Sequence, residues 1–454
     1  MLDAGVIMQM LLAAVGGTLI YTLIGIAPGT DETAVLAPVT LVLVLTGLEP
    51  IVILTFFMAA IIAKKLTDSI PVAVAGVPGG VMAAPMVEHA IVLKKHGKSD
   101  LSIRKMASGS VIGTIVAVPV SLLLANILVP YADQIQGYTN QILFGGAILL
   151  ALMSKNRWIA LASIVPFAIL IQGLRHLYWG VGVVPEGTNV FISFFLGITI
   201  GPVILTLFEL LNKDKRKAMN RYDNKTIALQ TEQSQKGLPN PFKILTQQEL
   251  SMSTLASFFG SLLFVLSPVG ITILLGELVS ARVKDPVKKS TLAISSMDAL
   301  TNASYISGTL IPLIALGIPL SPVAIGPANA LFNAPPVFTL EHNMHHLLTK
   351  TDFIWAVVIG AVVAIVITYF IIVKYAQQIC RFVFKWIPHE AVLGLFFGLV
   401  LLLAHMDGGL INIGGVLLIG LVAGFMHRLG INYGVQFMVL YAAPWIVTQL
   451  AGLS

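Results

Sequence analysis

Two adjacent lysines stand where an apolar stretch would be expected to continue. Lys64 and Lys65 follow the apolar run 51–63, and Asp68 comes one helical turn after Lys64. A charge inside hydrocarbon is costly unless it is paired or solvated, and such residues commonly mark a substrate or ion path. One interpretation is a basic site for an anionic substrate, partly offset by Asp68. The other is a helix end whose lysines extend along their alkyl chains to the membrane surface. The sequence leaves both open.

Carboxyl groups elsewhere in apolar segments could bind or carry a cation. Asp298 lies four residues before Asn302, so the two share one face of a helix, and we expect both to belong to a site. Asp31 and Glu32 follow a proline-glycine turn. They could bind a coupling ion or carry a proton, or they could simply be solvated at the tip of a hairpin.

The sequence offers little for metal or redox chemistry. Cys380 is the only cysteine, so no internal disulfide can form, and no Cys/His set has the spacing of a structural zinc site. His342, His345 and His346 have helical spacing that would suit a metal, but a solvated external loop is the favoured interpretation. We predict no metal and no cofactor.

Prolines and glycines interrupt four apolar segments. Pro28, Pro78, Pro268 and Pro319 remove helix donors, and adjacent glycines permit tight bends. In hydrocarbon, non-helical backbone survives only where it is buried in protein or lines a wet cavity. Freed carbonyls can then coordinate a cation, and exposed helix N-termini can hold an anion. A proline kink relieved by neighbouring helices is the simpler alternative. We predict non-helical backbone at 25–33, 76–80, 266–272 and 317–321.

Composition places these groups in a membrane protein. Of the 454 residues, 57% are hydrophobic and 11% are charged, whereas a soluble domain carries about 25% charged residues. Several apolar blocks are shorter than the roughly 20 residues that span hydrocarbon as a helix, which indicates hairpins or broken helices. The net charge of +6 comes from basic loops, as the positive-inside rule predicts, so no nucleic acid is expected. We expect no removable signal peptide.

The chain divides into two halves that look related. Ile-Pro recurs at 70 and 311, and Gly-x-Pro recurs with its proline at 78 and 319, both at an offset of 241. The stretch 212–250 has eight Lys and Arg against four acids, which predicts a cytoplasmic linker; a basic amphipathic partner site is the alternative. We predict a first repeat at 1–211 and a second at 251–454.

Loop charge predicts that the two repeats are inverted. If 5–48 and 251–281 are hairpins, 51–93 crosses inward to a basic loop, and 291–340 crosses outward to a loop poor in Lys and Arg. Every basic cluster then lies on one face of the membrane. Interrupted apolar segments at matching positions of inverted repeats are the best sequence indication of a secondary transporter. The predicted fold is an all-α polytopic membrane protein with a hairpin and a broken helix in each repeat.

The motifs, taken in order, resemble the large membrane subunit of tripartite tricarboxylate transporters. The likeness covers about 5–105 and 240–340. In the first half it is carried by Ile26-Ala-Pro-Gly, Gly47-Leu-Glu-Pro50, Ser69-Ile-Pro-Val-Ala-Val-Ala-Gly-Val-Pro-Gly79 and Lys95-His-Gly97. In the second half it is carried by Leu266-Ser-Pro-Val-Gly-Ile-Thr-Ile273, Asp298-Ala-Leu-Thr-Asn-Ala303 and Leu316-Gly-Ile-Pro-Leu-Ser321. The chain departs from the family where Lys64, Lys65, Thr67 and Asp68 precede Ser69, and where Leu320 replaces a glycine.

The resemblance implies secondary uptake of carboxylate anions across the bacterial inner membrane, driven by a cation gradient. It also implies a small four-helix membrane subunit and a periplasmic solute-binding protein as partners. The repeat further resembles ion-transporter-superfamily carriers, in which a transport domain moves like an elevator against a scaffold. The oligomeric state stays open, a homo-oligomer included. An intramembrane enzyme using Asp31, Asp68 or Asp298 is a weaker hypothesis because no paired catalytic motif is present, and a channel or structural subunit is weaker still.

These arguments define a predicted transport site for a di- or tricarboxylate, with Na⁺ or H⁺ as the coupling ion. The residues predicted to bind the substrate are Pro28, Gly29, Thr30, Lys64, Lys65, Ser69, Gly76, Pro78, Gly79, Gly80, Asn302, Gly317, Pro319 and Ser321. The residues predicted to hold the coupling ion are Asp31, Thr33, Ser267, Gly270, Thr272 and Asp298.

Overall fold

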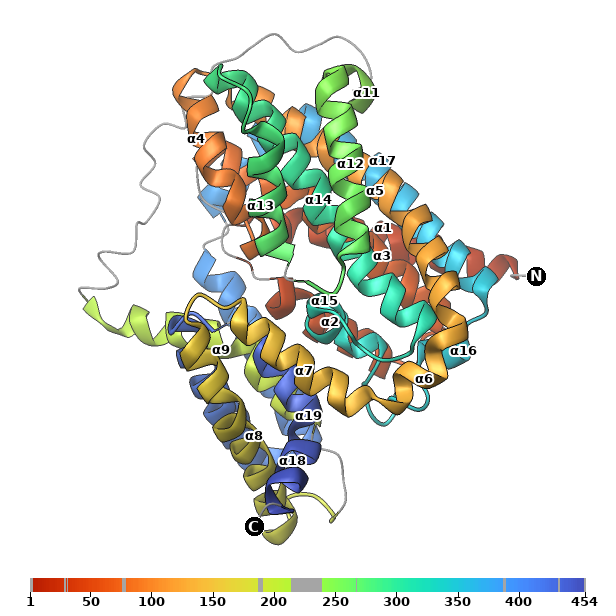
Figure 1. Ribbon diagram of the computed structural model, residues 1–454, viewed down its shortest axis with the longest axis vertical. Coiled ribbons are helices and arrows are strands. Elements are labelled where there is room, and N and C mark those ends of the chain that lie inside the picture. The colour runs from red at the N-terminus through yellow and green to blue at the C-terminus, as the bar shows by residue number, and fades with distance from the viewer. Residues whose placement is uncertain are drawn as a thin grey trace.

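The computed structural model describes residues 3–27, 30, 32–75, 79–186, 191–213, 239–266, 268–386, 389–431 and 433–452. Within these residues the protein is all-helical, as predicted, and no β-strand occurs (Figure 1). The first-half helices are α1 (Ala4–Ile26), α2 (Glu32–Leu45), α3 (Pro50–Ala75), the 3₁₀ helix η1 (Val81–Met86), α4 (Val87–Lys95), α5 (Ser99–Leu128), η2 (Val129–Tyr131), α6 (Ala132–Gly137), α7 (Thr139–Leu152), α8 (Arg157–Gly180) and α9 (Phe191–Leu211). The second-half helices are α11 (Pro241–Ile244), α12 (Gln247–Leu262), α13 (Pro268–Ser280), α14 (Pro286–Ala315), α15 (Pro322–Ile325), η3 (Asn329–Leu331), α16 (Met344–Leu347), α17 (Lys350–Trp386), α18 (His389–Arg428) and α19 (Tyr433–Ala451).

Local sequence sets several helix ends. Thr246 and Glu249 form a reciprocal capping box at the start of α12. The side chain of Asp285 caps α14 and is followed by Pro286, which fits the first helical turn because its missing N–H would have no partner there. Helix α18 is interrupted at Gly408 and Gly409, where Gly409 has a φ of 70°, a value that glycine adopts without strain.

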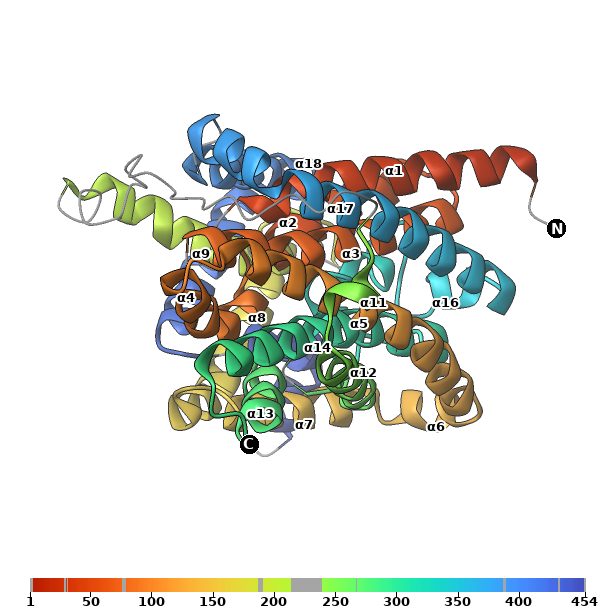
Figure 2. The ribbon, with the colours of Figure 1, turned by 90° about the horizontal axis from the view of Figure 1, so that it is seen from above.

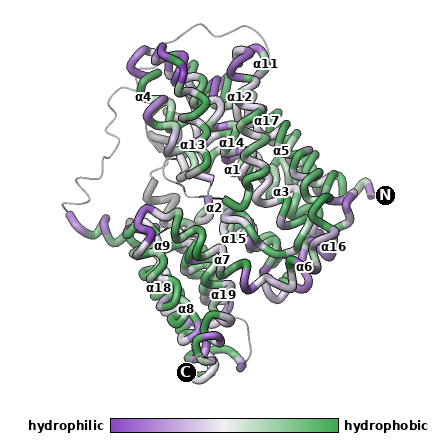
Figure 3. Tube along the Cα trace, in the orientation of Figure 1, coloured by the Kyte–Doolittle hydropathy of each residue, from purple (hydrophilic) through white to green (hydrophobic). Residues whose placement is uncertain are grey.

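The apolar helices make this a multi-pass membrane protein. Within the described ranges, seven helical segments are long and apolar enough to cross a membrane, judged by length and composition. Hydrophobic residues follow the bodies of helices such as α5 and α17, whereas hydrophilic residues gather at the ends of α4 and at α11 (Figure 3). The seven segments are Ala4–Ile26, Pro50–Val74, Ser99–Tyr131, Arg157–Gly180, Lys350–Tyr375, Phe397–Arg428 and Gly434–Ala451.

Helices α3 and α14 lie at the centre of the molecule. In the apolar stretch of α3, 94% of the residues are buried. Every residue of α14 from Ser290 to Ala315 is buried. Helix α14 is not among the seven apolar segments because it carries many serine, threonine and amide side chains. Its polar groups are shielded by protein instead of lipid, which is the setting in which polar residues persist within a membrane.

Two glycines let α5 and α14 approach closely. A Cβ atom at Gly109 or Gly113 would overlap the backbone carbonyls of Ser295 and Ala299, respectively. Small residues four apart on each helix allow this contact, as in Gly-x-x-x-Gly pairs of membrane helices. The approach brings the polar face of α14 within reach of side chains on α5.

The helices gather in two groups, and each group draws on both halves of the chain. In one group α1, α3, α5, α12, α14 and α17 pack on one another, and in the other α7, α8, α9, α18 and α19 do so (Figure 1). Seen from above, α1 and α17 lie side by side (Figure 2). Helix α2 contacts α3 in the first group and α9 and α18 in the second, and α15 contacts α14 and α19. These two short helices join the groups.

Packing partners are exchanged between the halves in a reciprocal way. Helix α3 packs against α1 of its own half and α17 of the other, while α14 packs against α12 of its own half and α5 of the other. Helix α2 contacts η3, and α13 contacts η1. Each hairpin therefore lies against the segment that follows the central helix of the opposite half.

The predicted breaks agree with the structure only in part. The stretch 317–321 is non-helical, which confirms that break, and residues 79 and 80 are also outside any helix. The break predicted at 266–272 was placed too far along the chain. The turn occupies 263–266, and a helix begins again at Pro268, because proline is tolerated in a first helical turn. In 25–33, only Ala27 and Thr30 are non-helical among the described residues.

The predicted linker 212–250 contains ordered structure at its end. Residues 214–238 lie outside the described ranges, but α11 and the start of α12 fall between 239 and 250. The Lys105 ammonium of α5 donates to the Ile244 carbonyl at 2.7 Å and forms a buried ion pair with Glu249. This contact fixes the start of the second hairpin against α5.

Candidate functional site

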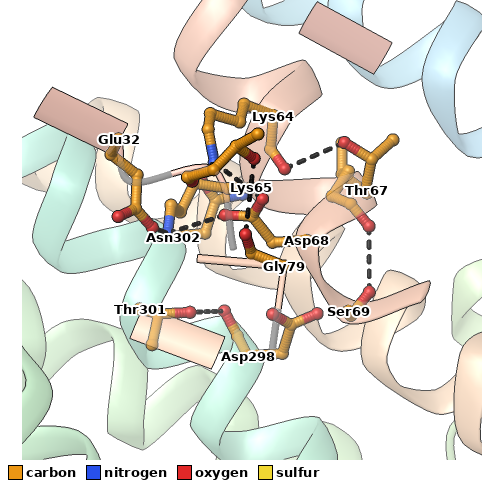
Figure 4. Close-up of polar contacts among 12 residues, drawn as sticks. Glu32, Lys64, Lys65, Thr67, Asp68, Ser69, Gly79, Asp298, Thr301 and Asn302 are labelled. Atoms are coloured by element: carbon orange, nitrogen blue, oxygen red, sulfur yellow. Dashed lines mark hydrogen bonds and ion pairs between the residues drawn. The ribbon is translucent and has the colours of Figure 1, made fainter. Parts of the chain in front are cut away.

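A buried cluster of four charged side chains joins α2 and α3. Lys64 Nζ lies 2.8 Å from Asp68 Oδ1, and Lys65 Nζ lies 2.5 Å from Glu32 Oε1 and 3.2 Å from Asp68 Oδ2 (Figure 4). The three residues of α3 share one helical turn, as their spacing predicted, whereas Glu32 is the first residue of α2. We call Glu32, Lys64, Lys65 and Asp68 the charge cluster.

The lysines of the charge cluster do not reach the membrane surface. The Lys64 and Lys65 side chains are 0% and 3% exposed, and both carboxylates are 3% exposed. Helix α3 also continues well beyond them, to Ala75. The alternative interpretation, a helix end whose lysines extend to the membrane surface, is therefore wrong. A buried ammonium is strongly unfavourable unless it is paired with an opposite charge. The carboxylates of Glu32 and Asp68 therefore stabilise the two lysines in this buried position.

The first hairpin and the first break surround the charge cluster. Lys64 also donates to the Thr30 carbonyl at 3.1 Å, and the Thr30 hydroxyl lies within hydrogen-bond distance of the Gly79 carbonyl, at 3.3 Å. A Cβ atom at Gly80 would lie 2.5 Å from Glu32 Oε1 and 3.1 Å from Asp68 Oδ2. The backbone of Gly80 therefore borders both carboxylates, and a side chain at this position would displace them.

One face of α14 points toward the charge cluster. Asp298, Asn302 and Tyr305 stand at positions i, i+4 and i+7 of this helix, which share a face. The Lys65 ammonium lies 4.6 Å from the centre of the Tyr305 ring, a favourable cation–π distance. Lys65 and Asp68 are the charged groups that act on Asp298, and Figure 4 shows Asp298 near them.

Asn302 uses its amide hydrogens to bind α5. Its Nδ2 donates to the Ser110 carbonyl at 2.9 Å and lies 2.7 Å from Thr114 Oγ1. Because a carbonyl can only accept, this contact fixes which amide atom is nitrogen. The other atom, Asn302 Oδ1, is buried without a partner, and so is Asp298 Oδ2. Two acceptor oxygens on one face of α14 are thus left for a cation or a proton.

The residues of the second break are held by their own surroundings. Gly317 has a φ of 67°, and its carbonyl accepts from the Asn343 side-chain amide at 2.8 Å. The Ser321 hydroxyl donates to the Gly308 carbonyl at 2.5 Å and accepts from the Ala324 N–H. Pro319 is buried between them. These hydrogen bonds all join residues of the second half, and none of them involves the charge cluster.

The loop beyond the second break closes the C-terminal end of α14. A ring nitrogen of His345 lies 3.0 Å from the Ile314 carbonyl. Desolvation, with His345 and His342 nearby, lowers the pKa of His346 below its usual value. Across the described residues, no group of three or more His, Cys, Asp or Glu could hold a metal ion.

The remaining predicted residues lie in three settings. The Ser69 and Thr272 hydroxyls bond carbonyls of their own helices, those of Leu66 and Pro268. Thr33 lies beside Gly326, which follows α15, and Gly270 lies within α13. The predicted residues outside the described ranges are Pro28, Gly29, Asp31, Gly76, Pro78 and Ser267.

Sequence reasoning missed several members of the site. Glu32 and Asp68 were noted but not included, although Asp68 stands at the i+4 position from Lys64 that forms helical ion pairs. Ser110 and Thr114 hold Asn302 from α5. The Gly109-x-x-x-Gly113 spacing around Ser110 was a usable sign of a close helix contact. Nothing in the sequence pointed to Tyr305.

This region holds one carboxyl group more than it holds ammonium groups. Lys64 and Lys65 contribute +2, whereas Glu32, Asp68 and Asp298 contribute −3, which leaves −1 when all five are ionised.

One of three comparisons with known proteins identifies the family of the chain. No curated protein and no solved structure matches the chain. The family model described as the tripartite tricarboxylate transporter TctA family matches residues 11–438. The match runs through both hairpins, both breaks and the charge cluster. The chain therefore belongs to the tripartite tricarboxylate transporter TctA family and is a transporter component, not an enzyme.

Proposed function

We propose that this protein imports a small organic anion, a di- or tricarboxylate, across the bacterial inner membrane in company with Na⁺ or H⁺. One observation carries the proposal: in a member of a tricarboxylate transporter family, two lysines are buried at the centre of an apolar bundle. Ammonium groups in such a place are expensive, and binding a carboxylate is a use that fits both their charge and the family.

Charge balance argues for a coupling cation. The five ionisable groups sum to −1 when ionised, so an anion that entered this region alone would meet net repulsion in a medium of low dielectric. Adding one Na⁺ or one proton neutralises the excess carboxylate. The anion and the cation would then bind together more tightly than either alone, which is the thermodynamic basis of coupled transport.

Asp298 and Asn302 are the proposed cation ligands. Asp298 Oδ2 and Asn302 Oδ1 are buried acceptors without a partner, and an unsatisfied buried oxygen costs free energy that a cation or proton would recover. Carboxylate and amide oxygens suit hard cations such as Na⁺. In this proposal Asn302 binds the coupling ion, whereas the sequence analysis predicted that it binds the substrate.

Alternating access through inverted repeats is part of the proposal. The reciprocal packing of α3 with α17 and of α14 with α5 supports a pseudo-two-fold relation between the halves. The two helix groups, joined by α2 and α15, are candidates for transport and scaffold domains that move relative to each other, as in an elevator mechanism. Lys64, Lys65, Asp68 and Asp298 lie in the group that contains α3 and α14, whereas Glu32 belongs to α2.

Partner subunits follow from the family description, which names a tripartite system. We propose a small four-helix membrane subunit and a periplasmic solute-binding protein. A second candidate is a membrane subunit that is inactive without the binding protein. Carriers of this kind receive their substrate from the binding protein, so the isolated chain would then bind anions yet fail to import them.

Uptake into proteoliposomes tests the proposal. Labelled citrate, succinate and glutamate are offered to the purified full-length protein, with Na⁺ and H⁺ gradients imposed separately. We expect uptake of at least one dicarboxylate or tricarboxylate that needs one of the two gradients. Absence of uptake with both gradients, even after the partner subunits are added, would refute the import of these anions.

A further inference from the structure

We propose that Glu32 takes the place of the substrate when no substrate is bound. Its carboxylate pairs with the Lys65 ammonium in the conformation described here, and a carboxylate of the incoming anion replaces the Glu32 carboxylate in this ion pair. The inference rests on the proposed function and assigns the anion-binding contact to one lysine. It also gives a role to Glu32, which neither the sequence motifs nor the family description assigns.

Glu32 is the exchangeable carboxylate because it belongs to a different helix from the lysines. Asp68 stands three and four residues after them on α3, so it moves with them in any rigid-body displacement. Glu32 begins α2, a helix that also contacts α9 and α18 of the other helix group. A displacement of α2 relative to α3 therefore separates Glu32 from Lys65 and leaves both lysines paired with Asp68.

The surroundings of Lys65 define what can replace Glu32. Its ammonium is bounded by Asp68 Oδ2 at 3.2 Å and by the Tyr305 ring at 4.6 Å, and the backbone of Gly80 borders the Glu32 carboxylate. Lys64 is already bonded to Asp68 and to the Thr30 carbonyl. The space open to a ligand is thus that of one planar carboxylate beside Lys65, with the rest of the anion extending along the path that Glu32 leaves.

Electrostatics favours exchange over addition. With Glu32 in place, the charge cluster is neutral, since two ammonium groups face two carboxylates. Without Glu32 it carries +1, which attracts an anion strongly in a buried site. The substrate and Glu32 therefore compete for Lys65, and removing the Glu32 charge must strengthen anion binding. If Glu32 is purely structural, removing its charge leaves anion binding unchanged or weaker.

Binding measurements on the purified full-length protein test this inference. Citrate, succinate and acetate are titrated as sodium salts against matched sodium chloride, and Kd and Tm are recorded for the wild type and Glu32→Gln. We expect Glu32→Gln to lower Kd for citrate or succinate about tenfold or more, because the ligand no longer displaces a charge-assisted hydrogen bond. Each carboxylate that binds should also raise Tm more in the variant than in the wild type.

Two further variants make the result specific. Glu88→Gln removes an exposed carboxylate of α4 and should bind as the wild type does. The double variant Glu32→Gln with Lys65→Met has neither partner of the ion pair and should lose the gained affinity. If Glu32→Gln fails to fold, Glu32→Ala offers the same test, since acetate can fill the space left and should raise its Tm but not that of the wild type.

The outcomes separate this inference from the proposed function. Wild-type binding of citrate or succinate with an equal or higher Kd in Glu32→Gln would overturn the proposed role of Glu32 alone. Retained high affinity in the double variant would also overturn it. If no carboxylate binds to any variant and the wild type transports none, both the inference and the proposed function fail.

Discussion

Lys64 and Lys65 are neighbours in sequence but have different partners. Lys64 bonds a carboxylate of its own helix and a backbone carbonyl, whereas Lys65 joins α2, α3 and the ring of Tyr305. At the residue scale the two lysines therefore have separate tasks. Lys64 secures the first hairpin against α3, and Lys65 is the lysine that we propose to bind the anion.

Replacing Lys65 with methionine should destabilise the protein strongly. The change leaves Glu32 and Asp68 buried without this ammonium, and breaking a buried ion pair costs about 3–5 kcal/mol. Adding Glu32→Gln should recover most of that loss, because it removes the unpaired carboxylate. Thermal unfolding in detergent measures both effects, with Lys95→Met at an exposed position of α4 as a control that stays within about 0.5 kcal/mol. A double variant no more stable than Lys65→Met would contradict the pairing.

Asn302→Ala should abolish uptake while the protein still reaches the membrane. The change removes the free Oδ1 together with the hydrogen bonds to α5. Thr114→Val is the matched control, since it removes one acceptor of the same amide at a cost of about 0.5–1.5 kcal/mol and keeps Oδ1. We expect Thr114→Val to retain uptake. Loss of uptake in both variants would show that the helix contact, and not the free oxygen, is what matters.

At the scale of elements, the contact of α5 with α14 positions the amide and the carboxyl group of the site. Gly113 allows the contact, because any side chain there meets the Ala299 carbonyl. Gly113→Leu should therefore destabilise the protein by about 1–3 kcal/mol or more and reduce uptake. Gly173→Ala in α8, where a Cβ atom meets open space, should be neutral or slightly stabilising. Equal Tm values for the two variants would argue against tight packing of α5 on α14.

Helical spacing in the sequence predicted which residues share a helix face better than it predicted where helices begin or which helices meet. The helical spacing of Lys64 and Asp68, and of Asp298 and Asn302, was readable from the sequence and holds in the structure. The ion pair between Lys65 and Glu32 was not, because it joins residues 33 positions apart and depends on how α2 meets α3. The second hairpin turn was misplaced because Pro268 begins a helix instead of ending one. The burial of the polar helix α14 could not be predicted from its sequence either, because the helices that cover it come from both halves of the chain.

At the scale of the whole molecule, transport by inverted repeats places the corresponding ends of the two repeats on opposite sides of the membrane. Cys380 is the only cysteine, so a Cys380→Ser background gives a chain without thiols. A membrane-impermeant maleimide should label Glu341→Cys in intact cells, and it should label Lys94→Cys only after permeabilisation. The two positions lie beyond corresponding crossings of the two halves. Labelling of both from the same side would contradict inverted repeats.

We predict that the anion binds only with a cation that neutralises the excess buried carboxylate. The direct test is to measure citrate and succinate Kd for the purified wild type and for Asp298→Asn, first with Na⁺ against choline at fixed pH and then across pH without Na⁺. We predict that the wild-type Kd rises about tenfold or more when the coupling cation is withdrawn, and that Asp298→Asn binds with no such dependence. A wild-type Kd that is unchanged by both Na⁺ and pH, or a dependence that persists in Asp298→Asn, would contradict the account.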